Sequence, residues 1–335
     1  MRVRFWGVRG SCPAWVTSAD IATRLTAALW QLGQEHSGPE ISQLLSDHNA
    51  INQWITKLPP HVQGVVGGNT PCVEMRTASD DLFIIDFGTG IRALGHELAQ
   101  AEFGRGAGHA HLFLSHFHWD HIQGWPFFTP AYIAGNRLEI YTAHEDLKDR
   151  LRRQQTAPFF PPASWDDMKA DITYTEMGSR PLLLCDGRVR VTAMELDHPS
   201  RSYAYRFEAD DKIFVYASDA AYPDLSTAAI QPYIDFYRDA DLLIFDAQFS
   251  FAESYEKRTW GHSSAIIGVE LALHAGVKNL ALFHHDPNAD DETLEYLRHV
   301  AEEYLATVPD VIYQDVVYSN KMRVLLARED MTIEL

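Results

Sequence analysis

Residues 115–124, SHFHWDHIQG, place four side chains of types that bind metals within six residues. In extended backbone, side chains two residues apart point the same way, so His116, His118 and Asp120 can converge on one ion. His121 follows on the other side of the chain and can serve a second ion. Imidazoles and a carboxylate without thiolates are typical of catalytic Zn, Mn or Fe sites. A lone histidine is usually an ordinary hydrogen-bonded residue, but four residues that can bind metals at this spacing indicate a metal centre.

Several other short apolar runs also stop at a histidine or an aspartate, and runs of this length predict buried strands. The residues that follow these runs are Asp86, His198, Asp219, Asp246, and the pair His284 and His285. The cluster at 116–121 cannot complete two coordination shells alone, so His198, Asp219 and His284 are candidates to finish them. The ordinary alternatives are a turn histidine, a turn aspartate and a buried polar residue. His262 stands at a predicted helix start, where the alternative is a capping-loop residue.

Strand patterns that alternate with helical ones predict an α/β layered fold. Helices are expected over residues 263–275, with Ser263 as N-cap and Gly276 as the stop, and over residues 290–307. Residues 14–66 have apolar positions at helical spacing and predict a two-helix insertion near the N-terminus. We expect residues 1–335 to form a single domain that carries this insertion.

Composition narrows the classes of function. Lys and Arg total 28 against 46 Asp and Glu, a net charge of -18 that repels DNA and long RNA. A small phosphate ester is still compatible, because bound dications can dominate the local field. The three cysteines are far apart and indicate no disulfide framework or thiolate zinc site. With no apolar run near ~18 residues and no signal-peptide pattern, we expect a cytoplasmic protein without a membrane partner; a homodimer is compatible.

Five motifs carry a specific resemblance to a known family. They are residues 4–11 (RFWGVRGS), 67–70 (GGNT), 86–90 (DFGTG), 115–124 and 283–287 (FHHDP). With the order of His198, Asp219 and His262, they resemble the metallo-β-lactamase superfamily, and within it the ribonuclease Z-like and cyclic-phosphodiesterase-like branch. The likeness covers most of the chain outside the insertion. It implies a four-layer αββα sandwich with two divalent metal ions at one edge, Zn as the first expectation and Mn or Fe as alternatives.

The resemblance also implies a role for each candidate residue. The implied ligands are His116, His118 and His198 for one metal, Asp120, His121 and His284 for the other, and Asp219 as the bridge. His284 is preferred over His285 because it directly follows the strand. His262 corresponds to the catalytic proton donor, and Asp120 is counted as catalytic as well as a ligand. Asp86 and His285 are expected to support the ligands rather than to bind metal.

This ligand set predicts a dinuclear metal-dependent hydrolase of ester bonds. The leading hypothesis is a phosphodiesterase for a small phosphodiester, such as a cyclic nucleotide or cyclic phosphate, attacked by a metal-bridging hydroxide. The second is a carboxylic ester, thioester or lactone hydrolase on the same metals, and the third is a non-catalytic metal sensor or scaffold. No segment resembles the long arm with which many ribonuclease Z enzymes grip tRNA. That absence and the acidic charge predict no long nucleic-acid partner.

Aromatic residues near the motifs are candidates to stack on a nucleobase. They are Trp119, Trp125, Phe159, Phe160, Tyr222 and Trp260. Core or loop packing is the ordinary explanation for each of them individually.

Overall fold

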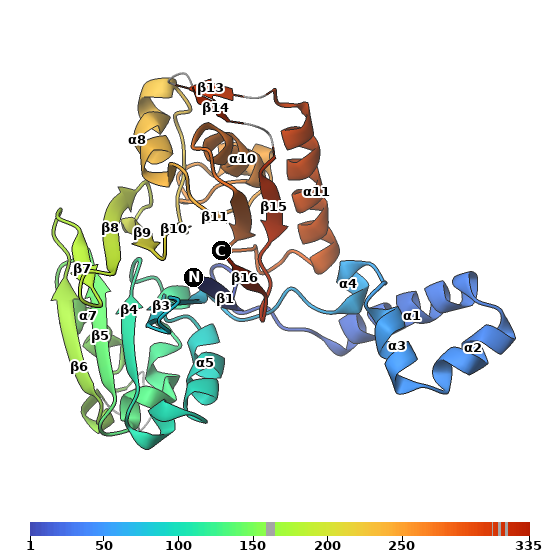
Figure 1. Cartoon of the computed structure of the whole chain (residues 1–335), viewed down its shortest axis with the longest axis horizontal. Helices are drawn as coiled ribbons and strands as arrows, with labels where there is room; N and C mark the ends of the chain where they lie inside the picture. Colours follow the sequence, from blue (N-terminus) through green and yellow to red (C-terminus); the bar gives the residue numbers. More distant parts are fainter. Residues whose placement is uncertain (159–164, 310, 314–315, 319–320) are drawn as a thin grey trace.

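The computed structural model describes residues 1–158, 165–309, 311–313, 316–318 and 321–335. Two seven-stranded sheets form the centre of the molecule (Figure 1). The first sheet has the order β16 (Thr332–Glu334), β1 (Arg2–Gly7), β2 (Cys72–Arg76), β3 (Leu82–Ile85), β4 (His109–Phe113), β5 (Arg137–Thr142), β6 (Asp171–Glu176). The second has the order β15 (Arg323–Leu326), β12 (Asn279–Phe283), β11 (Leu242–Asp246), β10 (Lys212–Ala217), β9 (Ser202–Ala209), β8 (Val189–Leu196), β7 (Leu182–Leu184). A separate pair joins β13 (Val311–Tyr313) to β14 (Val316–Tyr318).

Parallel pairing determines where the loops of the molecule gather. Strands β3, β4, β5 and β6 are parallel neighbours in the first sheet. Strands β10, β11, β12 and β15 are parallel neighbours in the second. The carboxyl ends of parallel strands meet at one edge of a sheet, which is where open α/β sheets place their sites. The predicted site residues after β3, β4, β10 and β12 are therefore brought to two such edges.

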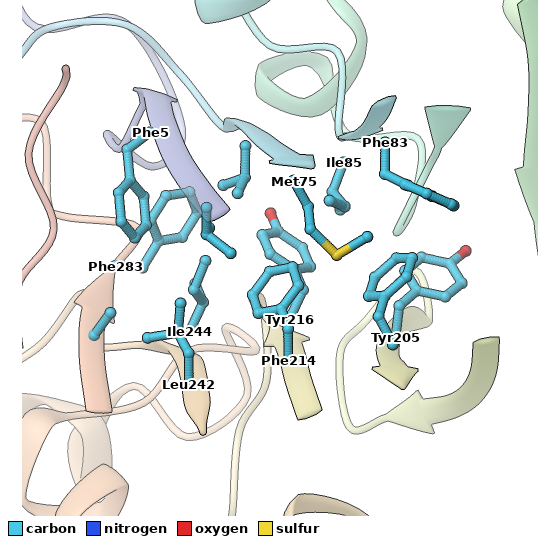
Figure 2. Packing of buried hydrophobic residues seen from close by; sticks show 14 of the residues in the cluster. Phe5, Met75, Phe83, Ile85, Tyr205, Phe214, Tyr216, Leu242, Ile244 and Phe283 are labelled. Carbon is cyan, nitrogen blue, oxygen red and sulfur yellow. The ribbon is translucent and has the colours of Figure 1, made fainter. Parts of the chain in front are cut away.

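A core of alternating side chains lies between the two sheets (Figure 2). In β3, Phe83 and Ile85 enter this core, while Leu82 and Ile84 face the helices on the other side. From the second sheet, Phe214 and aromatic neighbours on β9 and β12 pack against them. Each fully buried apolar side chain of this size contributes ~1.5–3 kcal/mol relative to exposure. Period-2 burial on both faces explains why these strands are nearly continuous apolar runs.

Helices cover the outer face of each sheet, which confirms the predicted αββα sandwich. The first sheet carries α5 (Gly90–Leu98), α6 (Trp119–Ile122), α7 (Leu147–Gln154) and the 3-10 turns Glu102–Arg105, Trp125–Phe127, Thr129–Tyr132 and Trp165–Asp167. The second carries α8 (Thr227–Tyr237), α10 (Ala265–His274) and α11 (Asp291–Thr307), and α9 (Phe251–Glu256) lies next to α10. The N-cap of α10 is Ser264, one residue after the predicted Ser263, because the Ser264 hydroxyl accepts the Ile267 amide. No helix among the described residues is long and apolar enough to cross a membrane.

The N-terminal insertion is helical as predicted, but the expected number of two helices is wrong. It consists of α1 (Ser18–Glu35), α2 (Gly38–Leu45), α3 (His48–Ile55) and the short α4 (Pro60–Gln63), which project away from both sheets (Figure 1). Caps at Ser37 and Asp47 divide the second half into separate helices. On the periodic apolar face of α1, Leu25 and Leu29 are 60% and 67% exposed, whereas Leu32 near the end of the helix is buried at 5%. Helical periodicity predicted the helix correctly. Because the segment projects away from the sheets, most of its apolar face packs against no hydrophobic core.

Candidate metal centre

The predicted site residues meet where the carboxyl ends of the two parallel strand sets approach each other. Asp86, Asp219 and His284 follow β3, β10 and β12, and all three adopt the left-handed backbone conformation, with φ of 61°, 59° and 59°. That conformation costs of order 1 kcal/mol for a residue with a side chain, and it persists where surrounding structure enforces it. Clustered strain of this kind is typical of a functional site.

One group of ligand atoms contains three histidines and a carboxylate. One atom each from His116, His118, His198 and Asp219 lies within 4.8 Å of the others. His118 faces the group with Nδ1, 3.1 Å from His198 Nε2, because its Nε2 contacts the Ser200 hydroxyl at 2.8 Å. His198 in turn donates its Nδ1 proton to the Gly261 carbonyl at 2.9 Å, which leaves Nε2 free to bind a metal.

The second group shares the carboxylate of Asp219 with the first. Its other members are Asp120, His121 and His284, and all four side chains are buried. His121 Nε2 lies 3.1 Å from Asp219 Oδ2, and His284 Nε2 lies 3.1 Å from Asp120 Oδ2. Because α6 begins at Trp119, the extended chain ends at His118, and Asp120 joins the second group instead of His116 and His118. The expectation from extended backbone that Asp120 converges with those two histidines is therefore wrong.

The donor atoms of both groups fit divalent metals. His116 Nε2 is buried, points at Asp219 across 3.7 Å and has no hydrogen-bond partner among the described residues. Burial lowers the pKa of His116, His118 and His198, so these imidazoles are held in the neutral form that binds metal. Asp120 and Asp219 are buried carboxylates beside them, and buried negative charge is costly unless a cation offsets it.

The adjacent His284 and His285 face opposite directions. His284 joins the second ligand group, whereas buried His285 contacts the Ala327 carbonyl through Nε2 at 2.9 Å. Burial lowers the pKa of His285 to about 3, so it donates this hydrogen bond as a neutral ring. Gly10 packs directly on His284, since a Cβ there would lie 2.5 Å from the His284 ring. His284 is therefore the residue of this pair that the geometry offers to a metal.

Asp86 supports the ligands from behind, in the position proposed for it. It is fully buried, and its Oδ2 accepts from His121 Nδ1 at 2.7 Å and from the Tyr216 hydroxyl at 2.6 Å. Its Oδ1 accepts the backbone amide of Ser115 at 2.7 Å. These bonds fix the His121 ring so that Nε2 faces the metal group.

Replacing Asp86 with asparagine is expected to weaken metal binding by ~10–100-fold, the usual effect of losing a carboxylate behind a ligating histidine. The asparagine NH2 group would face N–H and O–H groups that donate hydrogen bonds to the natural carboxylate. Asparagine still tolerates the left-handed backbone conformation at this position. Competition with a metal chelator measures the change. The matched control is Asp80→Asn, since Asp80 is exposed and also has positive φ. A metal affinity of Asp86→Asn equal to that of the control would show that Asp86 does not support metal binding.

His262 stands at the mouth of the centre and is oriented by a carboxylate that sequence reasoning left without a role. Its Nδ1 donates to Asp246 Oδ2 at 2.7 Å, and Nδ1 lies 4.0 Å from Asp219 Oδ1. Burial alone would lower the pKa of His262, but the Asp246 carboxylate outweighs it and raises this pKa to about 9. A histidine held protonated beside a ligand group can deliver a proton to a leaving group.

Asp246 is fully buried and connects several parts of the site. Besides His262, it accepts the backbone amides of Asp219 at 3.1 Å, Gln248 at 3.1 Å and Ser263 at 3.2 Å. In the sequence, Asp246 is recognisable as a residue at the end of an apolar strand, but its pattern indicates no specific role. The available signal was its position at the end of an apolar strand, like that of Asp219 after the neighbouring β10 and that of Asp86 after β3 in the other sheet.

Gly261 allows His198 and His262 to share this corner. Its φ is +85°, and a Cβ there would lie 2.1 Å from His198 Nδ1. Gly261→Ala is therefore expected to displace His198 and to reduce metal content and activity together, by about tenfold or more if ~1.4 kcal/mol of binding is lost. Metal analysis after dialysis checks this. Gly178→Ala, at a position with open space around it, is the control and is expected to change neither.

A cavity of about 280 Å3 opens on the centre. Its lining residues are Ser11, His118, Trp119, Asp120, Asp219, His262 and His284. Of the aromatic candidates, Trp119 is 81% exposed and lines this cavity, while Trp260 is 62% exposed. Trp125 and Tyr222 are buried in the core, and Phe159 and Phe160 lie outside the described residues. Trp119 is therefore the aromatic side chain that a ligand in this cavity would meet.

Comparisons with known proteins agree with this architecture. A family model described as a β-lactamase superfamily domain matches residues 83–285. Ribonuclease Z of Halorubrum lacusprofundi is 24% identical over 280 residues, 65% of this chain and 83% of that protein. The metallo-β-lactamase fold protein YhfI of Bacillus subtilis has a TM-score of 0.59 at 17% identity, covering 99% of this chain and 98% of that one. A diphosphatase from the PhnP family has a TM-score of 0.56 at 16% identity, covering 100% and 97%.

The matched segment contains every residue of the two ligand groups, from His116 after β4 to His284 after β12. It also spans more than half of the chain, and the structural neighbours reproduce the fold from end to end. The chain therefore belongs to the metallo-β-lactamase superfamily and is a metal-dependent hydrolase of that fold.

Proposed function

We propose that the protein is a phosphodiesterase for a small phosphodiester, such as a cyclic nucleotide or cyclic phosphate, with two divalent metal ions as cofactors and Zn as the first candidate. The observation that carries this proposal is His262, held protonated by Asp246 beside both ligand groups. An alkoxide leaving group needs a proton to depart, and His262 can supply it. A thiolate does not, since thiols have an ordinary pKa of ~8.5, so a thioester gives His262 no task.

In the proposed site, each of the two ligand groups holds one metal ion. His116, His118 and His198 would hold one ion, Asp120, His121 and His284 the other, and Asp219 would lie between them. When bound, the ions would polarise the phosphoryl oxygens and lower the pKa of water toward ~7. Ser11 fixes Asp120 through its backbone amide at 2.8 Å, so this carboxylate keeps its orientation during turnover. His262 would donate its proton to the departing oxygen.

The cavity supports a small substrate. Its volume of about 280 Å3 is at the lower end of ligand pockets, which range from ~300 to ~1,000 Å3. Exposed Trp119 at its rim offers a flat face to a nucleobase, and stacking of this kind contributes ~1–3 kcal/mol per base. A nucleoside cyclic phosphate would place its phosphate at the metals and its base against Trp119.

Long RNA is the second candidate substrate, because curated relatives such as the Halorubrum protein are named ribonuclease Z. We propose against it on charge, since a net charge of -18 opposes a polyanion across the whole surface. We further propose that residues 1–335 act as one domain with its helical insertion and that the protein is cytoplasmic. These two statements rest on the sequence alone.

A substrate panel on the metal-loaded protein tests the proposed function. It contains 2′,3′- and 3′,5′-cyclic nucleotides, bis-p-nitrophenyl phosphate, a precursor tRNA, a thioester and a lactone. The expected result is the highest kcat/KM on a cyclic nucleotide, with Trp119→Ala raising KM for nucleotides but not for bis-p-nitrophenyl phosphate. Preference for the thioester or lactone would replace the proposal with the second hydrolase hypothesis, and preference for the tRNA would overturn the argument from charge. Activity on none of them would favour a metal-binding sensor or scaffold.

A further inference from the structure

A separate group of metal-type side chains lies at the opposite ends of β4 and β5 from the candidate metal centre. His109 and His111 are the first and third residues of β4, so their side chains share one face of the sheet. Glu139 on β5 lies directly opposite His111 in the register. His116 is five positions after His111 along a nearly extended chain, which corresponds to roughly 16 Å at ~3.3 Å per residue. An ion at this place would therefore share no ligand with the catalytic groups.

The donor atoms of this group lie at distances that suit one metal ion. One atom each from His109, His111 and Glu139 lies within 4.8 Å of the others. His109 Nε2 is 3.1 Å from Glu139 Oε1, and His111 Nδ1 is 3.7 Å from Glu139 Oε2. Two ligand atoms at ~2.1 Å from a tetrahedral ion lie ~3.4 Å apart. Both measured separations are within a few tenths of an ångström of that value.

The surrounding side chains hold two of the three ligands in place. The His111 ring stacks on Phe83 with centroids 4.9 Å apart, and its Nε2 lies 3.6 Å from Cys185 Sγ. Nδ1 faces Glu139 and also lies 3.3 Å from the Tyr141 hydroxyl, a contact that a bound ion would replace. The Tyr141 hydroxyl donates to Glu139 Oε2 at 2.5 Å, so the carboxylate is oriented from the side away from His109. Burial, and then the nearby His109, lower the pKa of His111 to about 4, which keeps the ring neutral.

The open side of the group gives an ion access from solvent. The His109 side chain is 45% exposed, whereas His111 and Glu139 are 7% and 14% exposed. Arg137, with a side chain 60% exposed, forms an ion pair with Glu139 and would have to turn toward water for a cation to bind. The ordinary alternative is a surface cluster in which His109, Arg137 and Glu139 form ion pairs and no metal binds.

We propose that His109, His111 and Glu139 bind one divalent transition-metal ion, with Zn²⁺ as the probe of choice, at a third site remote from the catalytic centre. Two imidazoles and a carboxylate form a borderline ligand set that suits Zn²⁺, and water completes the coordination. The ion would connect the starts of β4 and β5. Because these ligands are assembled only in the folded chain, binding would stabilise the fold by mass action.

The decisive experiment counts Zn²⁺ after equilibrium dialysis, by mass spectrometry of the metal. It compares Asp219→Ala, in which the catalytic centre is impaired, with Asp219→Ala combined with His109→Ala or Glu139→Gln. Loss of one equivalent of Zn²⁺ in both double variants is expected. His299→Ala in the same background is the matched control, because exposed His299 also faces a glutamate, Glu302, at 3.3 Å but belongs to no group of three ligands among the described residues. Equal Zn²⁺ content in the double variants and the control would overturn the proposal.

A second measurement keeps the site distinct from the catalytic one. In the otherwise natural chain, His109→Ala and Glu139→Gln are expected to leave the hydrolytic rate unchanged and to abolish part of the Zn²⁺-dependent rise in Tm. A fall in the hydrolytic rate that parallels the loss of Zn²⁺ would overturn the proposal, since it would mean that the lost ion belongs to the catalytic centre. The result is independent of which substrate the enzyme prefers, because its main readout is metal content.

Discussion

Replacing His262 with alanine is expected to lower kcat by ~10²–10⁴-fold on an alkyl phosphodiester while both catalytic metals remain bound. His262 lies outside the two proposed ligand groups, although one of its ring nitrogens is within 4.8 Å of donor atoms of Asp219, Asp246 and His284. Asp246 engages its Nδ1 at 2.7 Å, which favours a role as proton donor over a role as ligand. Its removal therefore takes away a proton donor and leaves the seven proposed ligands intact. Metal analysis of the purified variant, together with kcat, separates the two effects. Loss of metal with loss of activity would make His262 a ligand instead.

The choice of leaving group sharpens this test. p-Nitrophenolate departs without a proton, so bis-p-nitrophenyl phosphate is expected to be hydrolysed by His262→Ala at nearly the natural rate. With a cyclic nucleotide, the P–O bond to the ribose breaks and the ribose oxygen departs as an alkoxide that needs a proton, so the full loss is expected. Equal losses on both substrates would contradict a role in proton donation, because a positioning or structural defect does not distinguish leaving groups.

The pH profile gives an independent measure of the same proton. The Asp246 carboxylate raises the pKa of His262 to about 9, so the acid form predominates below that pH and activity falls as pH rises through it. Asp246→Asn removes the largest of the contributions that raise this pKa and leaves those of Asp219 and Asp120, so the alkaline limb is expected at lower pH. Bound cations would lower the pKa in both proteins, so the difference between the two profiles is the quantity to compare.

The grouping of the proposed ligand residues could be predicted because all of them lie at or within a few residues of the end of an apolar strand, and strand ends are visible in sequence. The role of Asp246 could not, because a strand-end aspartate is common in turns and its contact with His262 depends on a loop 16 residues further along the chain. The tautomer of His118 was equally inaccessible, since Ser200 determines which nitrogen faces the metals. Short-range patterns specify elements, whereas these contacts are set by tertiary structure.

The insertion shows the same limit from the other direction. The apolar spacing of Ile21, Leu25 and Leu29 predicted a helix, and α1 is one, but these side chains are 51%, 60% and 67% exposed. The spacing of apolar residues indicates that a helix has an apolar face, but it does not indicate which other part of the protein, if any, packs against that face. The breaks between α1, α2 and α3 depend on caps at Ser37 and Asp47, and sequence spacing alone merged them into fewer helices.

Removing the Asp219 carboxylate is expected to abolish activity to the level of the uncatalysed background and to empty or disorder both catalytic metal positions. Asp219 is the one residue that belongs to both ligand groups, with Oδ1 3.7 Å from His116 Nε2 and Oδ2 3.1 Å from His121 Nε2. It is 1% exposed and sits between the other donors, so no solvent-facing group among the described residues can take its place. Metal content and kcat/KM of Asp219→Ala are the measurements.

A conservative variant excludes a packing defect as the cause. Asp219→Asn keeps the volume and tolerates the φ of 59°, yet it removes the negative charge that a bridging position requires. Its metal content is expected to fall as in Asp219→Ala, with the Tm of the metal-free protein close to the natural value. Asp239→Asn, at an exposed position with a φ of 57°, serves as the control for the backbone conformation. A bridging residue stabilises two cations through the negative charge of its carboxylate. Retention of both catalytic metals in Asp219→Asn would therefore show that Asp219 is not the bridge.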